Sequence, residues 1–269
     1  SNSFAMRSAK LAGLAGILLL NPGVCSLQAA QPVVESFSGG ANGWEGISDF
    51  GTGNWFFTGG VARVVFDPVP LFPDIGTLSN AAGATSGSFT GNFDTAGIEV
   101  IGFSFLAPNT LPASSVVELE WGGSTSVYRR GFSVTQTGVW FAFTASLQEV
   151  DKNQWTVNKG SLNDFAAARQ SVNHVALRVA RTLTVAHQFL FDNLFVAGLP
   201  GGASVVHGPS NRIEWDGLLA GLNYQVQSTT NLVASPWVTV ESLTATGALH
   251  STIITNTVRD MEAFRIRFE

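Results

Sequence analysis

Hydrophobic residues recur in short blocks along the chain, and within several blocks they alternate with polar residues. In the segment "HVALRV", Val175, Leu177 and Val179 fall on one face of an extended strand, and the residues between them fall on the other. A period of two is typical of a strand with one buried face. Further blocks rich in β-branched and aromatic residues, separated by Gly, Asn, Pro or Ser, predict strands at 61–66, 98–107, 115–121, 138–147, 172–180 and 187–198.

Two segments break this succession of strands. Residues 161–170 ("SLNDFAAARQ") predict a short helix, because Ser and Asn stand in capping positions before an alanine run. Residues 198–211 concentrate Gly and Pro, and a second series of short alternating segments follows them. We interpret this stretch as a linker. The pattern therefore predicts an all-β chain with one domain at 33–199 and a smaller one at 200–269.

The first 30 residues have the order of an export signal. After a short extension before Met6, the basic residues Arg7 and Lys10 precede an apolar run at 11–20, and small residues follow at Ala29-Ala30. The apolar run is shorter than the roughly 20 residues that cross a bilayer. We expect residues 1–30 to be removed as a signal peptide, which leaves a secreted, extracellular or cell-surface protein without a membrane span.

Composition supports the all-β interpretation and removes some classes of function. The chain is 45% hydrophobic and only 12% charged, with 29 Gly and 20 Phe, a mixture that favours strands and turns over helices. The net charge of −5 gives no electrostatic reason to expect nucleic acid. The single cysteine, Cys25, excludes an internal disulfide.

Two regions resemble known folds. The opening segment "ESFSGGANGWEG" (35–46) and the closing segment "FLFDNLFVAG" (189–198) resemble the first and last strands of jelly-roll carbohydrate-binding modules, also called galactose-binding-like domains. That family places an acid before a Gly-rich turn and a Trp in the first strand, and Asp followed by Asn or Asp in the last. The resemblance implies a jelly-roll β-sandwich at 33–199.

The C-terminal part resembles a small fibronectin-III-like module found in secreted bacterial proteins. The resemblance implies a second, fibronectin-III/Ig-like β-sandwich at 200–269, whose usual role is spacing or association with a surface. The positions that match the pattern of that module are Trp215, Tyr224, Val226, Ser228, Trp237, Phe264 and Arg265.

Asp192 is the one acid in the mostly apolar segment 187–198. Both faces of this strand are apolar, which predicts a buried, central strand, and a buried carboxylate is costly unless it is paired, hydrogen-bonded or bound to a metal. The first and last strands of a jelly roll lie close together, so the resemblance brings Glu35 toward Asp192. Two acids favour a structural Ca²⁺ with carbonyl ligands from the Gly39–Gly43 turn. The alternative is an Asp192 satisfied by backbone N–H groups or by an arginine.

Candidate catalytic residues are few. Glu118 and Glu120 in "VELEW" lie on one strand face about 6.5–7 Å apart, a spacing compatible with the acid/base pair of a glycosidase. We interpret them instead as a solvated strand face. No zinc-binding histidine motif, nucleophile elbow or P-loop occurs in the sequence. We therefore assign no catalytic residue and expect no enzymatic activity, although a polysaccharide-degrading jelly-roll enzyme remains an alternative.

Tryptophans are the remaining candidates for binding, because sugars stack their C–H faces on indole rings while polar neighbours fix their orientation. Trp55 and Trp155 lie in polar segments that we interpret as exposed loops, beside Asn54 and Gln154. Trp140, in "VWFAF", is expected in the core. The leading hypothesis is a secreted, non-catalytic protein that binds a polysaccharide or cell-surface glycan. The alternative is a structural or adhesive extracellular protein without a sugar site.

Overall fold

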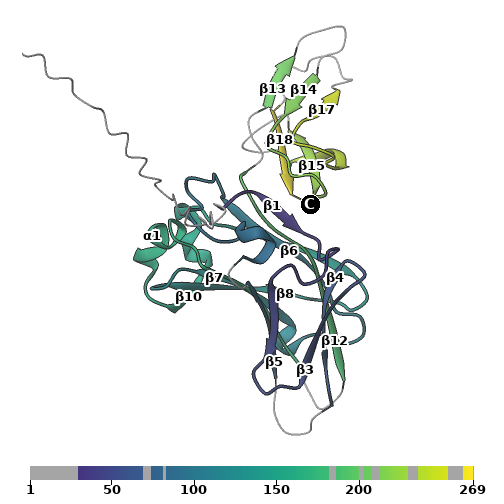
Figure 1. The fold of residues 1–269 in the computed structure, drawn as a ribbon. Helices are drawn as coiled ribbons and strands as arrows, with labels where there is room; N and C mark the ends of the chain where they lie inside the picture. Colours follow the sequence, from purple (N-terminus) through teal and green to yellow (C-terminus); the bar gives the residue numbers. More distant parts are fainter. Residues whose placement is uncertain are drawn as a thin grey trace, which may run out of the picture.

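The computed structural model describes residues 30–68, 74–80, 83–181, 186–199, 203–206, 212–229, 236–253 and 263–268. Apart from Ala30, the predicted signal peptide lies outside these residues. No helix in the described ranges is long and apolar enough to cross a membrane. The described chain consists mainly of β-strands, as predicted, and Figure 1 shows them as a larger sandwich next to a smaller one.

The larger sandwich contains a six-stranded sheet that we call the β12 sheet. Its neighbouring strands all pair antiparallel. The central place of β12 confirms the prediction from its two apolar faces, and its pairing with β1 brings the first and last strands of the sandwich together. The order in space is β3 (Gly53–Thr58), β4 (Val61–Phe66), β12 (His187–Ala197), β6 (Val100–Leu106) and β9 (Trp140–Ser146), with β1 (Val33–Glu35) paired to β12.

The second sheet of the larger sandwich, which we call the β7 sheet, also has six antiparallel strands. The chain passes back and forth between the two sheets, so strands distant in sequence become neighbours. The order in space is β10 (Thr156–Lys159), β8 (Val127–Ser133), β7 (Val116–Gly122), β11 (His174–Ala180), β5 (Ile75–Asn80) and β2 (Trp44–Ser48).

Alternate residues of both sheets meet in one core. On β7 the inward residues are Val117, Leu119 and Trp121, and on β12 they include Phe189 and Phe191; all five are 0% exposed. Burying one large apolar side chain contributes about 1.5–3 kcal/mol. The remaining residues of β7 and its neighbours point away from this core, and they form the outer face considered below.

A short helical segment precedes β11, as the sequence predicted. The 3-10 turn η4 (Leu162–Asp164) leads into α1 (Phe165–Arg169). The Ser161 hydroxyl accepts from the N–H of Asn163, and the Asp164 carboxylate accepts from the N–H of Ser161, which completes a capping box. Three further 3-10 turns occur in the described ranges, η1 (Ala84–Gly87), η2 (Ala113–Ser115) and η3 (Glu149–Gln154).

The smaller sandwich has two three-stranded sheets. The predicted linker at 198–211 is wrong in part, because Ala203–Val206 forms a strand that pairs with the next strand of this sandwich. One sheet has the order β13 (Ala203–Val206), β14 (Arg212–Trp215) and β17 (His250–Ile253), and the other β16 (Val238–Thr244), β15 (Asn223–Thr229) and β18 (Ala263–Phe268).

The smaller sandwich packs against the outer face of the β12 sheet. Tyr224 and Val226 on β15 belong to one hydrophobic cluster with Phe195 and Ala197 on β12. The rings of Phe195 and Phe268 lie 5.2 Å apart between centroids. The C-terminal strands therefore cover one part of this face and leave the rest open (Figure 1).

Candidate functional site

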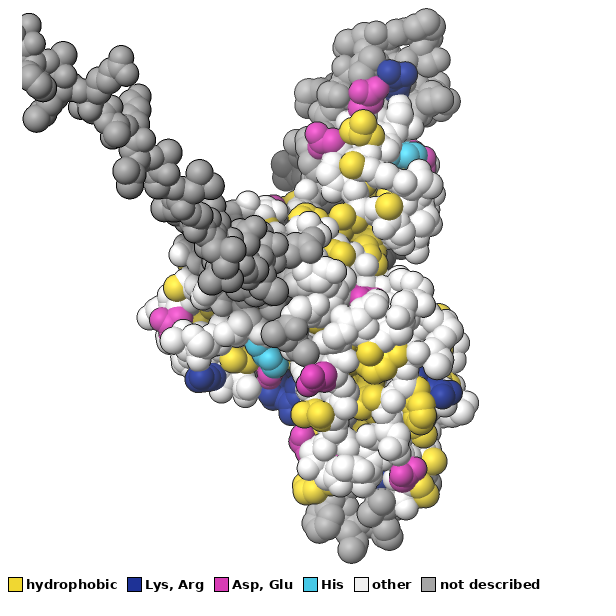
Figure 2. All heavy atoms as spheres, in the orientation of Figure 1, with side chains coloured by type: hydrophobic (Ala, Val, Ile, Leu, Met, Phe, Trp, Pro, Cys, Tyr) yellow, Lys and Arg dark blue, Asp and Glu magenta, His cyan; other side chains and the backbone are white. Residues whose placement is uncertain are grey.

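Charged side chains gather on the outer face of the β7 sheet. The strand register places Arg129 on β8 opposite Glu120 on β7, and Arg178 on β11 opposite Glu118. His174 begins β11 on the same side. Figure 2 shows a histidine beside basic and acidic side chains on the larger sandwich. In a chain with only 12% charged residues, this concentration marks the face as a candidate site.

Glu120 is the centre of the charged cluster. One carboxylate oxygen accepts from Arg129 Nη2 at 2.7 Å, Arg129 Nε at 3.0 Å and Asn158 Nδ2 at 3.2 Å. The other oxygen lies 2.7 Å from His174 Nε2. The residue is 8% exposed, so these partners replace nearly all of its water.

The pKa of Glu120 is lowered from 4.5 to about 2. Burial alone would raise it, but the hydrogen bonds and positive charge of His174 and Arg129 outweigh burial because they stabilise the ionised form. Glu120 therefore holds no proton near neutral pH and cannot act as the general acid of a glycosidase pair.

A pocket of about 370 Å³ opens beside this cluster, within the usual size range of small-molecule sites. Its polar lining comes from Glu118, Arg129, Arg178 and Ser114. Arg178 Nη1 lies 3.5 Å from Glu118 Oε2, and Arg129 Nε lies at the same distance. We call this pocket and its charged lining the β7 groove.

The rim of the β7 groove is a strained turn. Ser114 and Ser115 have φ values of +57° and +54°, in the left-handed region that non-glycine residues seldom adopt. Such strain of roughly 1–3 kcal/mol per residue persists only where the surrounding structure fixes it, and it often accompanies ligand sites. In this turn, Ser114 lines the pocket.

The predicted exposure of Trp155 is wrong. The side chain is 3% exposed, packs edge-to-face on Trp121 with centroids 5.9 Å apart, and donates from Nε1 to the Ser146 carbonyl at 2.8 Å. Its polar neighbours lie in η3 at the surface, while the ring at the end of this turn points inward. Gln154 is exposed, and its amide oxygen accepts from Arg130 at 2.6 Å.

Trp55 is half-buried and lies on strand β3, so the segment interpreted as a loop is a strand. Its ring stacks on Phe191 at 5.9 Å and covers Gly46, where an added Cβ would lie 2.0 Å from Trp55 Cγ. The indole N–H donates to the Ile47 carbonyl at 3.0 Å. Asn54 is exposed on the opposite side of the same strand and donates to Asp67 at 3.1 Å.

Trp140, expected in the core, is 44% exposed. It lies on β9 at the edge of the β12 sheet, where the alternating residues Trp140, Ala142 and Thr144 face solvent. Every residue in "VWFAF" is apolar, so the sequence alone does not distinguish the inner face from the outer.

The two acids predicted to bind calcium lie on paired strands. Glu35, opposite Leu194, is 3% exposed and accepts from Phe37 N–H, Asn42 and Thr85. Asp192 accepts from the N–H of Asn193 at 2.6 Å, which is the backbone bond that the alternative interpretation predicted.

Burial raises the pKa of Asp192, the bond from Asn193 partly offsets this, and the charge of Glu35 raises the pKa further. Two acids that repel each other suit a hard cation, which prefers oxygen ligands. No group of three His, Cys, Asp or Glu side chains gathers in the described part of the chain. A cation here would therefore take its other ligands from neutral oxygens.

No protein-family model and no curated protein sequence matches the chain. Among solved structures, the Family 11 Carbohydrate-Binding Module of a cellulosomal cellulase of Clostridium thermocellum is 10% identical with a TM-score of 0.39, covering 63% of this chain and 96% of the module. The L4b domain of human laminin alpha-2 is 10% identical with a TM-score of 0.41, covering 63% and 99%.

A beta-1,2-glucanase from Parabacteroides distasonis is 9% identical with a TM-score of 0.36 and covers 89% of this chain and 35% of the enzyme. All three TM-scores are below 0.5, so no conclusion about this chain rests on them.

Proposed function

We propose that this chain is a non-catalytic extracellular protein that binds a neutral carbohydrate in the β7 groove. The observation that carries the proposal is the charge balance of the pocket lining taken together with Glu120, which lies behind the pocket and pairs with the arginines that line it. Two carboxylates, Glu118 and Glu120, face two guanidinium groups, Arg129 and Arg178, within 4 Å. The groove thus offers strong donors and acceptors without a net field that would select an anion or a cation.

Sugar hydroxyl groups both donate and accept, so they suit such paired groups. Glu118 is the most accessible acceptor, with a side chain 35% exposed, whereas the Arg178 side chain is 15% exposed. Hydrogen bonds to charged groups contribute about 1.5–3 kcal/mol. The low pKa of Glu120 keeps its carboxylate ionised near neutral pH, so it acts as a hydrogen-bond acceptor and cannot itself protonate a leaving group.

The test begins with the wild-type protein on an array of soluble neutral oligosaccharides, followed by titration calorimetry with the best binder. Glu118→Gln should weaken that complex roughly 10- to 150-fold, which corresponds to one charged hydrogen bond. The matched control is Glu45→Gln, which removes an exposed carboxylate from the same sheet on β2. Equal affinity of wild type and Glu118→Gln, or no binder at all, would favour the structural or adhesive alternative.

A structural Ca²⁺ held by Glu35 and Asp192 is a second part of the proposal. What supports it is the repulsion between these two acids, which contributes to the raised pKa of Asp192. The cation would neutralise this repulsion and tie the first strand of the sandwich to the last.

Export by the N-terminal segment and a spacer role for the fibronectin-III-like module complete the proposed function. The packing of β15 and β18 against Phe195 supports a module held firmly against the larger sandwich. N-terminal sequencing of exported protein should begin near Gln31.

A further inference from the structure

One row of side chains crosses the outer face of the β12 sheet, on the opposite side of the larger sandwich from the β7 groove. In the strand register Phe56 lies opposite Arg63, Arg63 opposite Leu190, Leu190 opposite Leu106, and Leu106 opposite Trp140. Five neighbouring strands thus each contribute one side chain to the same line. We call these five residues the cross-strand row.

The row is open to solvent and has an aromatic ring at each end. Phe56 is 40% exposed and Trp140 is 44% exposed, while the three residues between them are half-buried. The Arg63 guanidinium lies over the Phe56 ring, 4.9 Å from its centroid, and Arg63 Nε has no hydrogen-bond partner among the described residues. Figure 2 shows hydrophobic side chains grouped on the side of the larger sandwich where β3, β4 and β12 lie.

Polar groups border the cross-strand row on both sides. Asn54 on β3 and Gln188 on β12 each lie opposite Val65, two positions along their strands from the row. On the other side Asp192 lies opposite Ser104. The row is therefore apolar except for Arg63, and it runs between hydrogen-bonding side chains.

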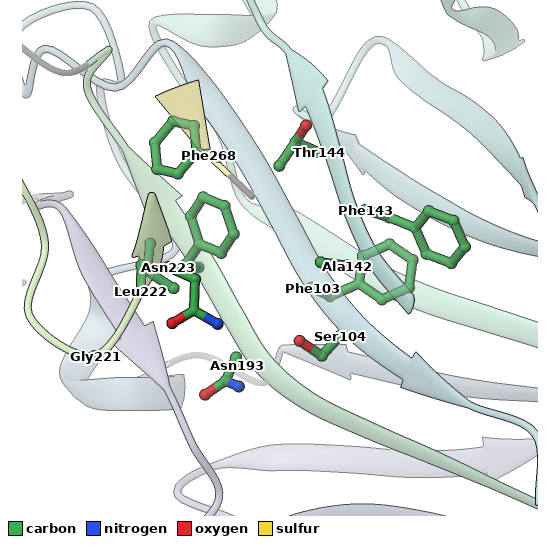
Figure 3. Close-up of a pocket in the computed structure, with 11 residues that line it drawn as sticks. Phe103, Ser104, Ala142, Phe143, Thr144, Asn193, Gly221, Leu222, Asn223 and Phe268 are labelled. Carbon is green, nitrogen blue, oxygen red and sulfur yellow. The ribbon is translucent and has the colours of Figure 1, made fainter. Parts of the chain in front are cut away.

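A small pocket of about 50 Å³ continues this border toward the smaller sandwich. Ser104, Asn193 and Thr144 line it from the β12 sheet, and Asn223 lines it from β15. Figure 3 shows Ser104 and Asn193 beside Asn223 in this pocket. The amide and hydroxyl groups of these residues continue the polar border of the row toward the smaller sandwich.

The dimensions of the row indicate what it can bind. Strands lie about 4.8 Å apart and residues on one face repeat about every 7 Å, so the row is about 19 Å long and about 7 Å wide. Its area of roughly 130 Å² is far below the ~800 Å² that each partner buries in a stable protein interface. Addition of a peptide strand is also excluded along its middle, because β4, β12 and β6 are already paired on both sides.

We propose that the cross-strand row binds a single extended chain of a neutral, β-linked polysaccharide. Such a chain is a flat ribbon whose pyranose rings present C–H faces, while its hydroxyl groups project from the edges. The rings of Phe56 and Trp140 stack on those faces, and the bordering amides and hydroxyls bind the edges. This inference rests on the proposed function for the class of ligand, but it assigns a second face made of different residues.

The experiment measures depletion of the full-length protein by three insoluble β-linked polysaccharides, namely microcrystalline cellulose, chitin and mannan, with α-linked starch granules as the reference. We expect retention by at least one of the three. Phe56→Ala and Trp140→Ala should each lower the partition constant by roughly 5- to 150-fold, the loss found for other aromatic stacking platforms. The matched control, Phe50→Ala, removes a ring that is 60% exposed outside the row and should leave retention unchanged.

The outcomes separate this face from the β7 groove. Glu118→Gln should keep the retention of wild type on the solid polysaccharide, and Trp140→Ala should keep the affinity of wild type for soluble oligosaccharides. The inference would be overturned if none of the three polysaccharides retained wild type, or if Trp140→Ala were retained as strongly as wild type. Neither result would bear on the proposal for the β7 groove. A dimer that forms with rising concentration and is abolished by Trp140→Ala would overturn it in favour of self-association, measured by sedimentation velocity.

Discussion

Replacing Glu120 with Gln tests whether the charged cluster stabilises the fold. The substitution keeps the shape of the side chain but removes the charge that Arg129 and His174 bind. The pKa of Glu120 is about 2, against 4.5 for the free side chain. That difference corresponds to roughly 3 kcal/mol of stability at neutral pH, since each pKa unit is worth about 1.4 kcal/mol.

The pH dependence has a definite sign. A lowered pKa means that the folded state prefers the ionised form, so the stabilisation is complete above pH 4.5 and is lost as the pH falls toward about 2. Glu120→Gln should therefore cost about 2–3 kcal/mol at pH 7, and the difference from wild type should shrink steadily below pH 4.5.

Urea unfolding at several pH values between 7 and 2, followed by tryptophan fluorescence, measures this difference. Glu45→Gln is a close control, because the strand register Glu45–Ser79–Ala176–Glu120 places the exposed Glu45 in the same cross-strand line as Glu120, three strands away. It should change stability by less than about 0.5 kcal/mol. A loss for Glu120→Gln that stays constant from pH 7 to pH 2 would refute the electrostatic explanation and point to packing instead.

Three further predictions concern buried or half-buried groups and are measured by thermal or urea unfolding. Calcium at about 100 times its Kd should add about 2.7 kcal/mol to the stability of wild type but nothing to that of Glu35→Gln, and equal melting curves with and without chelator would contradict the site. In the presence of chelator, Asp192→Asn should be more stable than wild type at pH 7, because the substitution removes a charge that the fold disfavours. Trp155→Ala should lose about 3–5 kcal/mol, and a loss under 1 kcal/mol would mean that the ring is exposed. Burial and then the charge of Arg181 lower the pKa of His187, so stability should fall as the pH drops below about 6.5, and His187→Leu should flatten that fall.

The sequence predicts strands well where a segment is apolar and β-branched over its whole length. The predicted strand at 61–66 coincides with β4, and the one at 187–198 differs from β12 by one residue. The helix at 161–170 was also recognisable, because a capping serine and an alanine run are local signals that need no tertiary contact.

Predictions of side-chain exposure were weaker, because they depend on contacts between distant segments. Trp55 lies against the core because Gly46, nine residues earlier, leaves room for its ring. Trp155 has polar neighbours in sequence but packs on Trp121 from another strand. Trp140 has apolar neighbours, yet it lies on an edge strand whose outer face is open.

The β7 groove shows the same limit. The sequence pattern places Glu118 and Glu120 together on one strand face. It also places Arg178 on the polar face of an alternating strand. Only the antiparallel order β8-β7-β11 brings Arg129 and Arg178 to these acids from opposite sides. Strand order is set by long-range packing, so the partners of the two acids could not be deduced from periodicity.

The acid in the apolar segment 187–198 has a physical explanation in the path of β12. The pairing with β6 shifts register between Asp192 and Phe195, and Asn193 adopts a φ of +47°, which together mark a β-bulge. Before the bulge Leu190 faces outward in the cross-strand row, and after it Phe195 faces outward beneath the smaller sandwich.

The outer face of β12 is therefore apolar at both ends for two different reasons. At one end it contacts the smaller sandwich, and at the other end it contributes Leu190 to the cross-strand row. Asp192 lies between these two regions, opposite Ser104, where the outer face is neither covered by the smaller sandwich nor part of the cross-strand row. Its carboxylate is only half-buried and caps the N–H of Asn193, which the bulge leaves outside the regular ladder. The single acid thus marks the boundary at which one outer face changes from a packing surface to the proposed binding surface.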